Sequence, residues 1–172
     1  ENILKFVNKK YKNNVLILKR DFDLSQFNVP ISKTLISISK TLEKKIKFDS
    51  ILKVNVDHPL LSLQNFESAI NILNLFEPDE VIAVKKENES FYQHNGKGLV
   101  PIQKSKNLIM EDQEIYKKIG SLHLFTKKCL YNYLKSKDKI TGHLILDNIK
   151  AFRVENKIDF EIFKLLQKIN DD

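Results

Sequence analysis

The 172-residue sequence has one cysteine (Cys129), four glycines, four prolines and no tryptophan. A single cysteine excludes an internal disulfide framework and a cysteine-based zinc site, and it favours a reducing, cytoplasmic location. So few glycines and prolines leave little material for a linker. No apolar run approaches the roughly 18 residues of a membrane span, and the first residues lack a signal-peptide layout. We expect one continuous domain, residues 1–172, without a membrane partner.

The formal net charge of +7 raises the possibility of a nucleic-acid partner. However, only two of the 29 basic residues are arginines, Arg20 and Arg153. Base and phosphate readout favours the bidentate arginine fork, whereas these lysines are spread along the chain among 20 isoleucines and 16 asparagines. The pattern favours a solvated, lysine-rich surface and no nucleic-acid partner. An anionic small-molecule substrate is compatible with this charge.

Apolar residues alternate between helical and strand periodicity along most of the chain. The spacing predicts helices over 1–11, 31–47, 64–76, 127–135 and 157–169. It predicts strands over 15–18, 50–56, 80–85, 119–125, 143–146 and 151–154, and irregular structure over 86–112. Ser62 and Asn156 are the expected N-caps of the third and last helices. This alternation is typical of an α/β fold with a largely parallel sheet.

Ligands of such sheets bind beyond the carboxyl ends of the strands, where two carboxylates are expected. Asp57 follows strand 50–56 and precedes His58–Pro59, so it either holds a hard cation such as Mg²⁺ or satisfies backbone groups in a turn. Glu155 follows strand 151–154. It either supplies a second oxygen ligand or interacts with the dipole of the last helix.

Other candidate groups give weaker signals. The four histidines lack metal-ligand spacing, and His123 either faces the crevice or is structural. The segment Asn95–Gly98 either cradles a phosphate or forms a simple turn. Cys129 is expected in the core, and no serine has the context of a hydrolase nucleophile, so no catalytic residue is assigned.

The order of several segments resembles a known family. These segments are Arg20–Leu24, helix 31–47, the Asn55–Leu60 loop, Tyr116-x-x-x-Gly120 and Glu155–Phe160. Over about residues 1–168 they resemble the cytidylyltransferases that make CMP-activated acid sugars, of the acylneuraminate and 3-deoxy-octulosonate types. The resemblance implies a Rossmann-like nucleotidyltransferase fold, a three-layer sandwich with a mostly parallel sheet, usually in a homodimer.

The resemblance also implies a reaction and a set of site residues. The reaction would transfer CMP from CTP to an acidic keto-sugar and release pyrophosphate, with Mg²⁺. Asp57 matches the metal-binding aspartate of an Asp-x-Pro-Leu loop, and Glu155 falls at the second metal carboxylate. The resemblance further implies sugar contacts at Asn55 and His123, and a nucleotide contact at Arg20.

The sequence departs from the family pattern at several points. Arg153 stands where acylneuraminate enzymes often have a further aspartate, and Ile119 replaces the usual asparagine before Gly120. Glu155 replaces an aspartate and reaches further. The family's first strand and Gly-rich phosphate loop have no counterpart, as if the chain started roughly 50–60 residues, or two βα units, late. Such a chain is either an N-terminally truncated enzyme or, alternatively, a non-catalytic α/β binding or assembly module.

We predict that the 172-residue chain alone does not turn over CTP, because no loop of the family's type grips the triphosphate. The measurement is pyrophosphate release in the presence of CTP, Mg²⁺ and a keto-acid sugar. Release above the protein-free background would contradict this expectation.

Overall fold

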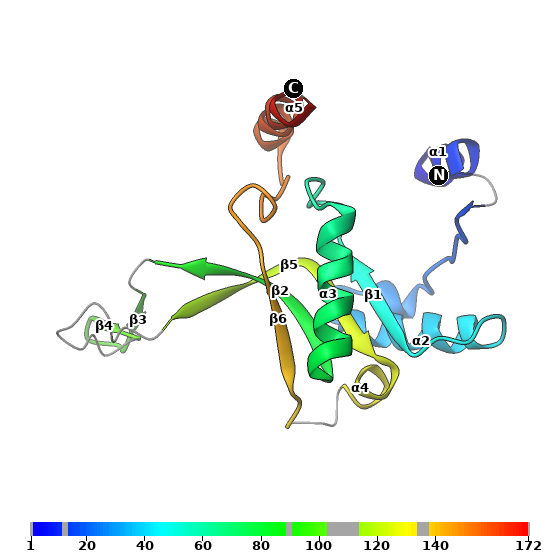
Figure 1. The fold of residues 1–172 in the computed structure, drawn as a ribbon, viewed down its shortest axis with the longest axis horizontal. Coiled ribbons are helices and arrows are strands. Elements are labelled where there is room, and N and C mark those ends of the chain that lie inside the picture. Colours follow the sequence, from blue (N-terminus) through cyan, green and yellow to red (C-terminus); the bar gives the residue numbers. More distant parts are fainter. Residues whose placement is uncertain (1, 12–13, 89–90, 103–113, 134–137, 172) are drawn as a thin grey trace.

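A computed structural model describes residues 2–11, 14–88, 91–102, 114–133 and 138–171 (Figure 1). The helices are α1 (Asn2–Tyr11), the short 3₁₀ helix η2 (Asp23–Ser25), α2 (Ile31–Glu43), α3 (Leu63–Phe76), α4 (Lys127–Asn132) and α5 (Lys157–Asp171). The strands are β1 (Ser50–Val54), β2 (Glu80–Glu87), β3 (Tyr92–His94), β4 (Leu99–Pro101), β5 (Ile115–Thr126) and β6 (Thr141–Ile145). None of the described helices combines the length and the apolar character that crossing a bilayer requires.

The central sheet is mixed, and the prediction of a mostly parallel sheet is wrong. The strand order is β1-β5-β2-β6, in which β5 is antiparallel to both β1 and β2, while β2 and β6 are parallel. The reason lies in the connection from β2 to β5. Its described residues form the β3–β4 hairpin rather than a crossover helix, so β5 returns alongside β2 in the opposite direction (Figure 1).

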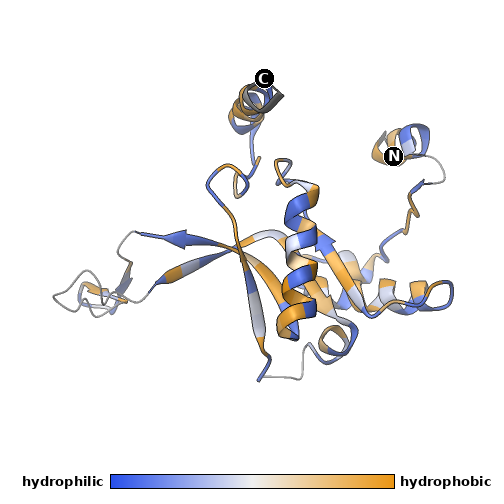
Figure 2. Ribbon diagram, viewed as in Figure 1, coloured by the Kyte–Doolittle hydropathy of each residue, from blue (hydrophilic) through white to orange (hydrophobic). Residues whose placement is uncertain are grey.

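Helices cover both faces of the sheet and make the three layers that the resemblance implies. On one face, Ala69 of α3 packs in a buried cluster with Val81, Leu122 and Leu124. On the other face, Phe125, Cys129 and Leu130 pack against Leu35 and Ile36 of α2. Figure 2 shows hydrophobic residues gathered where α3 meets the strands. Neighbouring residues of β5 thus point to opposite layers, as strand geometry requires.

The expected caps begin two of these helices. The Ser62 N–H donates to Asn65 Oδ1 (2.9 Å) at the start of α3. Asn156 Oδ1 accepts the N–H groups of Ile158 and Asp159 (2.8 and 3.0 Å) at the start of α5. Asn95–Gly98 forms the turn between β3 and β4, where Asn95 Oδ1 accepts two backbone N–H groups.

Two predicted strands, 15–18 and 151–154, are absent. Val15 and Leu16 are exposed and the segment has no regular structure, because none of the described strands pairs with it. The second segment is folded by local turns, with the Ala151 N–H bonded to Asp147 O (2.9 Å). A run of four apolar residues forms a strand only where a partner strand completes its hydrogen bonds.

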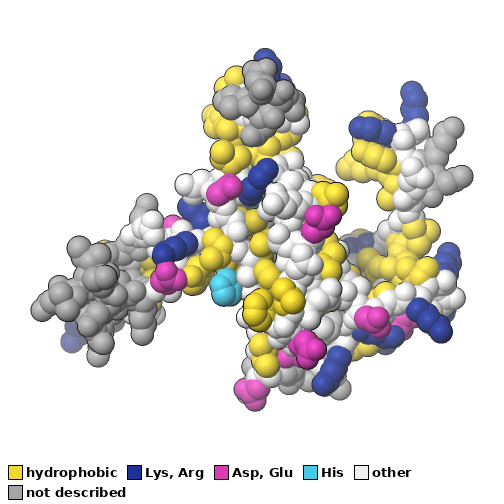
Figure 3. All heavy atoms as spheres, in the orientation of Figure 1, with side chains coloured by type: hydrophobic (Ala, Val, Ile, Leu, Met, Phe, Trp, Pro, Cys, Tyr) yellow, Lys and Arg dark blue, Asp and Glu magenta, His cyan; other side chains and the backbone are white. Residues whose placement is uncertain are grey.

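α1 and α5 project from the body of the molecule (Figure 1). The apolar spacing of helix 157–169 predicts that Ile158 and Leu165 face the core, and this prediction is wrong, because Ile158 is 73% exposed and Leu165 is 60% exposed. The side chain of Ile169, on the same expected face, lies outside the described residues. Figure 3 shows yellow apolar side chains on both projecting helices. Capping and periodicity specify such a helix without specifying what it packs against.

An irregularity in β5 shapes the centre of the sheet. His123 pairs with Ile82, but the next residue of β2, Ala83, pairs with Ile119. The three intervening residues of β5 leave the ladder with β2, and within them the carbonyl of Ser121 accepts the N–H of Asn55 (2.8 Å). Such irregularities bend a strand and redirect its side chains.

A buried carboxylate joins three strands. Glu80 of β2 is only 2% exposed. It accepts hydrogen bonds from His123 Nε2 of β5 (2.8 Å) and Thr141 Oγ1 of β6 (3.0 Å), and Lys139 Nζ lies 2.8 Å away. Burial opposes ionisation of the Glu80 carboxyl. The bonds from His123, Lys139 and Thr141 outweigh it and lower its pKa from 4.5 to about 2.

The Glu80→Gln variant should lose stability in a pH-dependent way. The lowered pKa means that the ionised carboxylate stabilises the fold above pH 4.5 and that this contribution is lost as the pH falls towards 2. A shift of this size corresponds to about 3 kcal/mol at neutral pH. Chemical denaturation from pH 7 to pH 3 should show that the difference in unfolding free energy between the unsubstituted protein and Glu80→Gln becomes smaller in acid. Glu67→Gln, at an exposed position, is the control. A difference that stays constant with pH would contradict the lowered pKa of Glu80.

Gly142 of β6 is expected to tolerate no side chain. An added Cβ would lie 3.0 Å from Pro78 Cγ and 3.1 Å from Ile72 Cγ2. Gly142→Ala should therefore cost about 1–3 kcal/mol through overpacking. Gly98→Ala is the matched control, because a Cβ there meets nothing within 4 Å. Equal unfolding free energies for the two variants would refute the expectation.

Candidate functional site

The two predicted metal carboxylates meet at one arginine. Asp57 follows β1, and Glu155 lies just before α5. Arg153 Nε lies 2.7 Å from Asp57 Oδ2, and Arg153 Nη1 lies 2.5 Å from Glu155 Oε1. The Val154 N–H also donates to the Asp57 carbonyl (2.8 Å). The segment before α5 is thereby held against the loop that follows β1.

The second oxygen of Asp57 has its own partner. Asp57 Oδ1 lies 2.9 Å from Nδ1 of the buried His58. Burial raises the pKa of the Asp57 carboxyl, but the bonds from Arg153 and His58 outweigh it and hold the pKa below its usual value. Among the described residues, no group of three or more His, Cys, Asp and Glu side chains could hold a metal ion. A metal site here would have the carboxylates of Asp57 and Glu155 as its protein ligands, and the bound substrate would supply the other oxygens.

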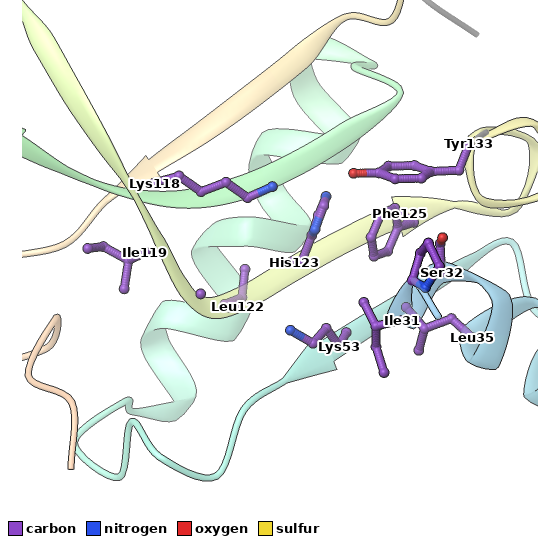
Figure 4. Close-up of a pocket in the computed structure, with 12 residues that line it drawn as sticks. Ile31, Ser32, Leu35, Lys53, Lys118, Ile119, Leu122, His123, Phe125 and Tyr133 are labelled. Carbon is purple, nitrogen blue, oxygen red and sulfur yellow. The ribbon is translucent and has the colours of Figure 1, made fainter. Parts of the chain in front are cut away.

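A cavity of about 220 Å³ lies between the start of α2 and strands β1 and β5 (Figure 4). The lysines Lys53 of β1 and Lys118 of β5 line it, together with the aromatic rings of Phe125 and Tyr133. His123, for which the sequence leaves open a place facing the crevice or a structural role, lines it as well. The irregular part of β5 contributes to the same wall. The cavity therefore combines cationic groups with flat apolar surfaces.

His123 is held in a fixed orientation. Its ring stacks on Phe125 with the centroids 3.7 Å apart, and Tyr133 meets it edge-on. Burial lowers the pKa of His123, against the opposing effect of the hydrogen bond with Glu80. Burial thus favours the neutral form of the imidazole, and Nε2 lies 2.8 Å from Glu80 Oε2. A ligand in the cavity would meet a ring that Glu80 and Phe125 hold in place.

The other two predicted contacts lie outside the cavity wall. Asn55 is half-buried after β1, and its side-chain nitrogen lies 3.6 Å from the position that a Cβ on Gly120 would take. Gly120 lines the cavity, so Asn55 stands directly behind that wall. Arg20 precedes η2, and its guanidinium donates to the carbonyl of Leu24. The structure does not bring Arg20 to the cavity.

Sequence reasoning missed Lys53 and Lys118. Both stand in strands, and nothing distinguishes them from the many other lysines of the chain. One signal was available for Lys53. It stands between Leu52 and Val54 in an apolar predicted strand, where a charged side chain is unusual. Recognising Lys118 required the bend in β5, which the sequence does not reveal.

The sequence matches no family model and no curated protein. Solved structures do match it. One is the 4-diphosphocytidyl-2C-methyl-D-erythritol synthase from Anaerococcus prevotii DSM 20548, with a TM-score of 0.65 and 14% identity, over 97% of this chain and 76% of that one. Another is CMP:2-keto-3-deoxy-manno-octonic acid synthetase complexed with CTP, with a TM-score of 0.55 and 11% identity, over 82% and 69% of the chains. The chain thus shares the Rossmann-like, three-layer α/β fold of these two synthases.

Proposed function

We propose that this chain is the cytidylyltransferase-like domain of an enzyme that transfers CMP from CTP to an acidic keto-sugar and releases pyrophosphate. The fold it shares with two synthases, one of them complexed with CTP, supports this class of reaction. The observation that carries the proposal is the meeting of Asp57 and Glu155 around one positive charge after β1. Carboxylates gathered in this way are suited to a nucleotide-bound cation.

The proposal includes Mg²⁺ held by Asp57 and Glu155. These donors fit the ion, because they are hard oxygens and already surround a cation, the guanidinium of Arg153. When bound, Mg²⁺ would offset negative charge on the phosphate oxygens. Arg153 is exposed, so its side chain has room to move away from the carboxylates. His58 keeps Asp57 oriented through the contact with Oδ1.

The remaining roles in the proposal follow from position. The ring of His123 would contact the sugar from the cavity wall, and Asn55 would contact it from the adjoining loop. Arg20 is retained as a nucleotide contact, which requires its loop to move from the position that the bond to Leu24 holds. In the reaction, the anomeric oxygen of the sugar bonds to the α-phosphorus, and the bond to the pyrophosphate oxygen breaks. The proton of the sugar hydroxyl passes to solvent, and no residue is proposed as its base.

A homodimer and a cytoplasmic location complete the proposal. The exposed apolar residues of α1 and α5, including Ile3 and Ile158, provide surface that a second copy would bury. The single cysteine suits a reducing compartment.

A non-catalytic binding or assembly module is the second candidate. Two observations favour it: Arg153 occupies the place between the carboxylates, and His123 is already bonded to Glu80. Such a module would keep the fold and bind no Mg²⁺–CTP at Asp57. Nucleotide binding therefore separates the two candidates.

CTP with Mg²⁺ should stabilise the protein, by about 2.7 kcal/mol at a hundredfold excess over its Kd. The stabilisation should disappear in Glu155→Gln, which removes one carboxylate. Glu161→Gln is the matched control, because Glu161 is similarly exposed and pairs only with Lys164 among the ion pairs of the described residues. Thermal melting with and without EDTA makes the comparison. No shift in the unsubstituted chain at saturating CTP would reject the enzyme and favour the module.

Arg153→Gln should raise the affinity for Mg²⁺, because the guanidinium competes for the same carboxylate oxygens. An exposed ion pair is worth little, so the gain should be at most about fivefold. Calorimetric titration with MgCl₂ measures it, with Lys164→Gln as a control for the loss of one positive charge. An unchanged or weaker affinity in Arg153→Gln would show that the carboxylates do not form the ion's site.

A further inference from the structure

The start of α2 lines the cavity, and its first two N–H groups have no hydrogen-bond acceptor among the residues that the structure describes. The helix follows Pro30, has no side-chain cap and has no acidic residue in its first turn. The Lys33 N–H reaches the Pro30 carbonyl (3.0 Å), but the N–H groups of Ile31 and Ser32 precede any intrahelical acceptor. Both residues line the cavity. The positive end of the helix dipole therefore faces this space.

A buried hydroxyl at the same place also lacks a partner. Ser32 is only 4% exposed, and its Oγ has no hydrogen-bond partner among the described residues. Ser39 of the same helix shows the contrast, because its Oγ donates to the Leu35 carbonyl (2.6 Å) one turn earlier. Ser32 stands in the first turn, where the helix offers no such carbonyl. A buried hydroxyl without a partner is unfavourable unless a ligand or water completes it.

Two lysines face the cavity from the opposite side (Figure 4). Lys53 is half-buried and Lys118 lies at the mouth, and neither forms an ion pair with any residue in the described part of the chain. Burial lowers the pKa of Lys53; Asp57 opposes this effect, and the charge of Lys118 adds to it. The negative charge of Glu80 behind His123 is offset by Lys139. The cavity thus gathers two lysines that form no ion pair within the described residues, and Asp57 is the carboxylate whose charge acts on Lys53.

We propose that this cavity is a phosphate site. The N–H groups of Ile31 and Ser32 and the hydroxyl of Ser32 would donate to the phosphate oxygens, and Lys53 and Lys118 would supply the compensating charge. Donors from a helix end and from two strands suit an anionic oxygen group, and the two lysines offset the double charge of a phosphate. The inference goes beyond CMP transfer, because it involves neither the Asp57–Glu155 pair nor Mg²⁺. The ligand class is a phosphate ester small enough for the cavity, and it would compete there with the sugar that the proposed function places beside His123.

The test uses the full chain, inorganic phosphate and EDTA, at an ionic strength kept constant with chloride. Phosphate should raise the melting temperature above the chloride reference and shift the amide NMR signals of Ile31 and Ser32. Lys53→Met and Lys118→Met should each weaken phosphate binding by about tenfold or more, as expected for a lost charge-assisted bond. Ser32→Ala should weaken it to a smaller extent. Lys117→Met is the matched control, since Lys117 is exposed and does not line the cavity.

Three results would overturn the proposal. The first is an effect of phosphate no stronger than that of chloride. The second is binding of acetate as tight as that of phosphate, which would assign a carboxylate site. The third is a loss of binding in Lys117→Met as large as in Lys118→Met, which would show a general charge effect. Lys118 is exposed, so its variant reports binding without a risk to folding. If Mg²⁺–CTP fails to bind while phosphate binds, the proposed function fails and the phosphate site stands.

Discussion

The carboxylate of Glu80 is the interaction on which much of the sheet depends. It carries a negative charge in the interior, where an unpaired carboxylate would be strongly unfavourable. His123, Lys139 and Thr141 approach it from separate parts of the chain, so the charge is stable only when β2, β5 and β6 are in register. The same contact orients the ring of His123, which stacks on Phe125. The central strands and the cavity wall are thus stabilised together.

Two clusters of charged side chains accompany this core, and they differ in which ions they attract. At Arg153, opposite charges already meet, and the exposed guanidinium joins two carboxylates. In the cavity, Lys53 and Lys118 meet no described counterion, and the start of α2 adds its own positive field. Cations are attracted to the first group and anions to the second. A nucleotide with a bound metal ion would use both kinds of attraction.

Much of the local structure follows from the sequence. Apolar spacing alone predicts α2, α3 and α5. Asn156 marks the start of α5 because its side chain accepts first-turn N–H groups, and Ser62 marks the start of α3, where its N–H donates to the side chain of Asn65. The strand predictions are less successful. The segments 15–18 and 151–154 have the right composition but no partner strand. The direction of β5 depends on the β3–β4 connection, which local periodicity does not describe.

The candidate site likewise has features that follow from the sequence and features that depend on tertiary structure. The sequence by itself determined that the chain forms an alternating α/β fold and that Asp57 and Glu155 follow apolar segments, because side-chain periodicity and capping are local properties. Only the tertiary structure decided that Arg153 joins these carboxylates and that His123 bonds to Glu80, 43 positions away. It also decided that two lysines among many face one cavity with the start of α2. These relations depend on strand register and on the bend in β5, which arise when distant segments pack together.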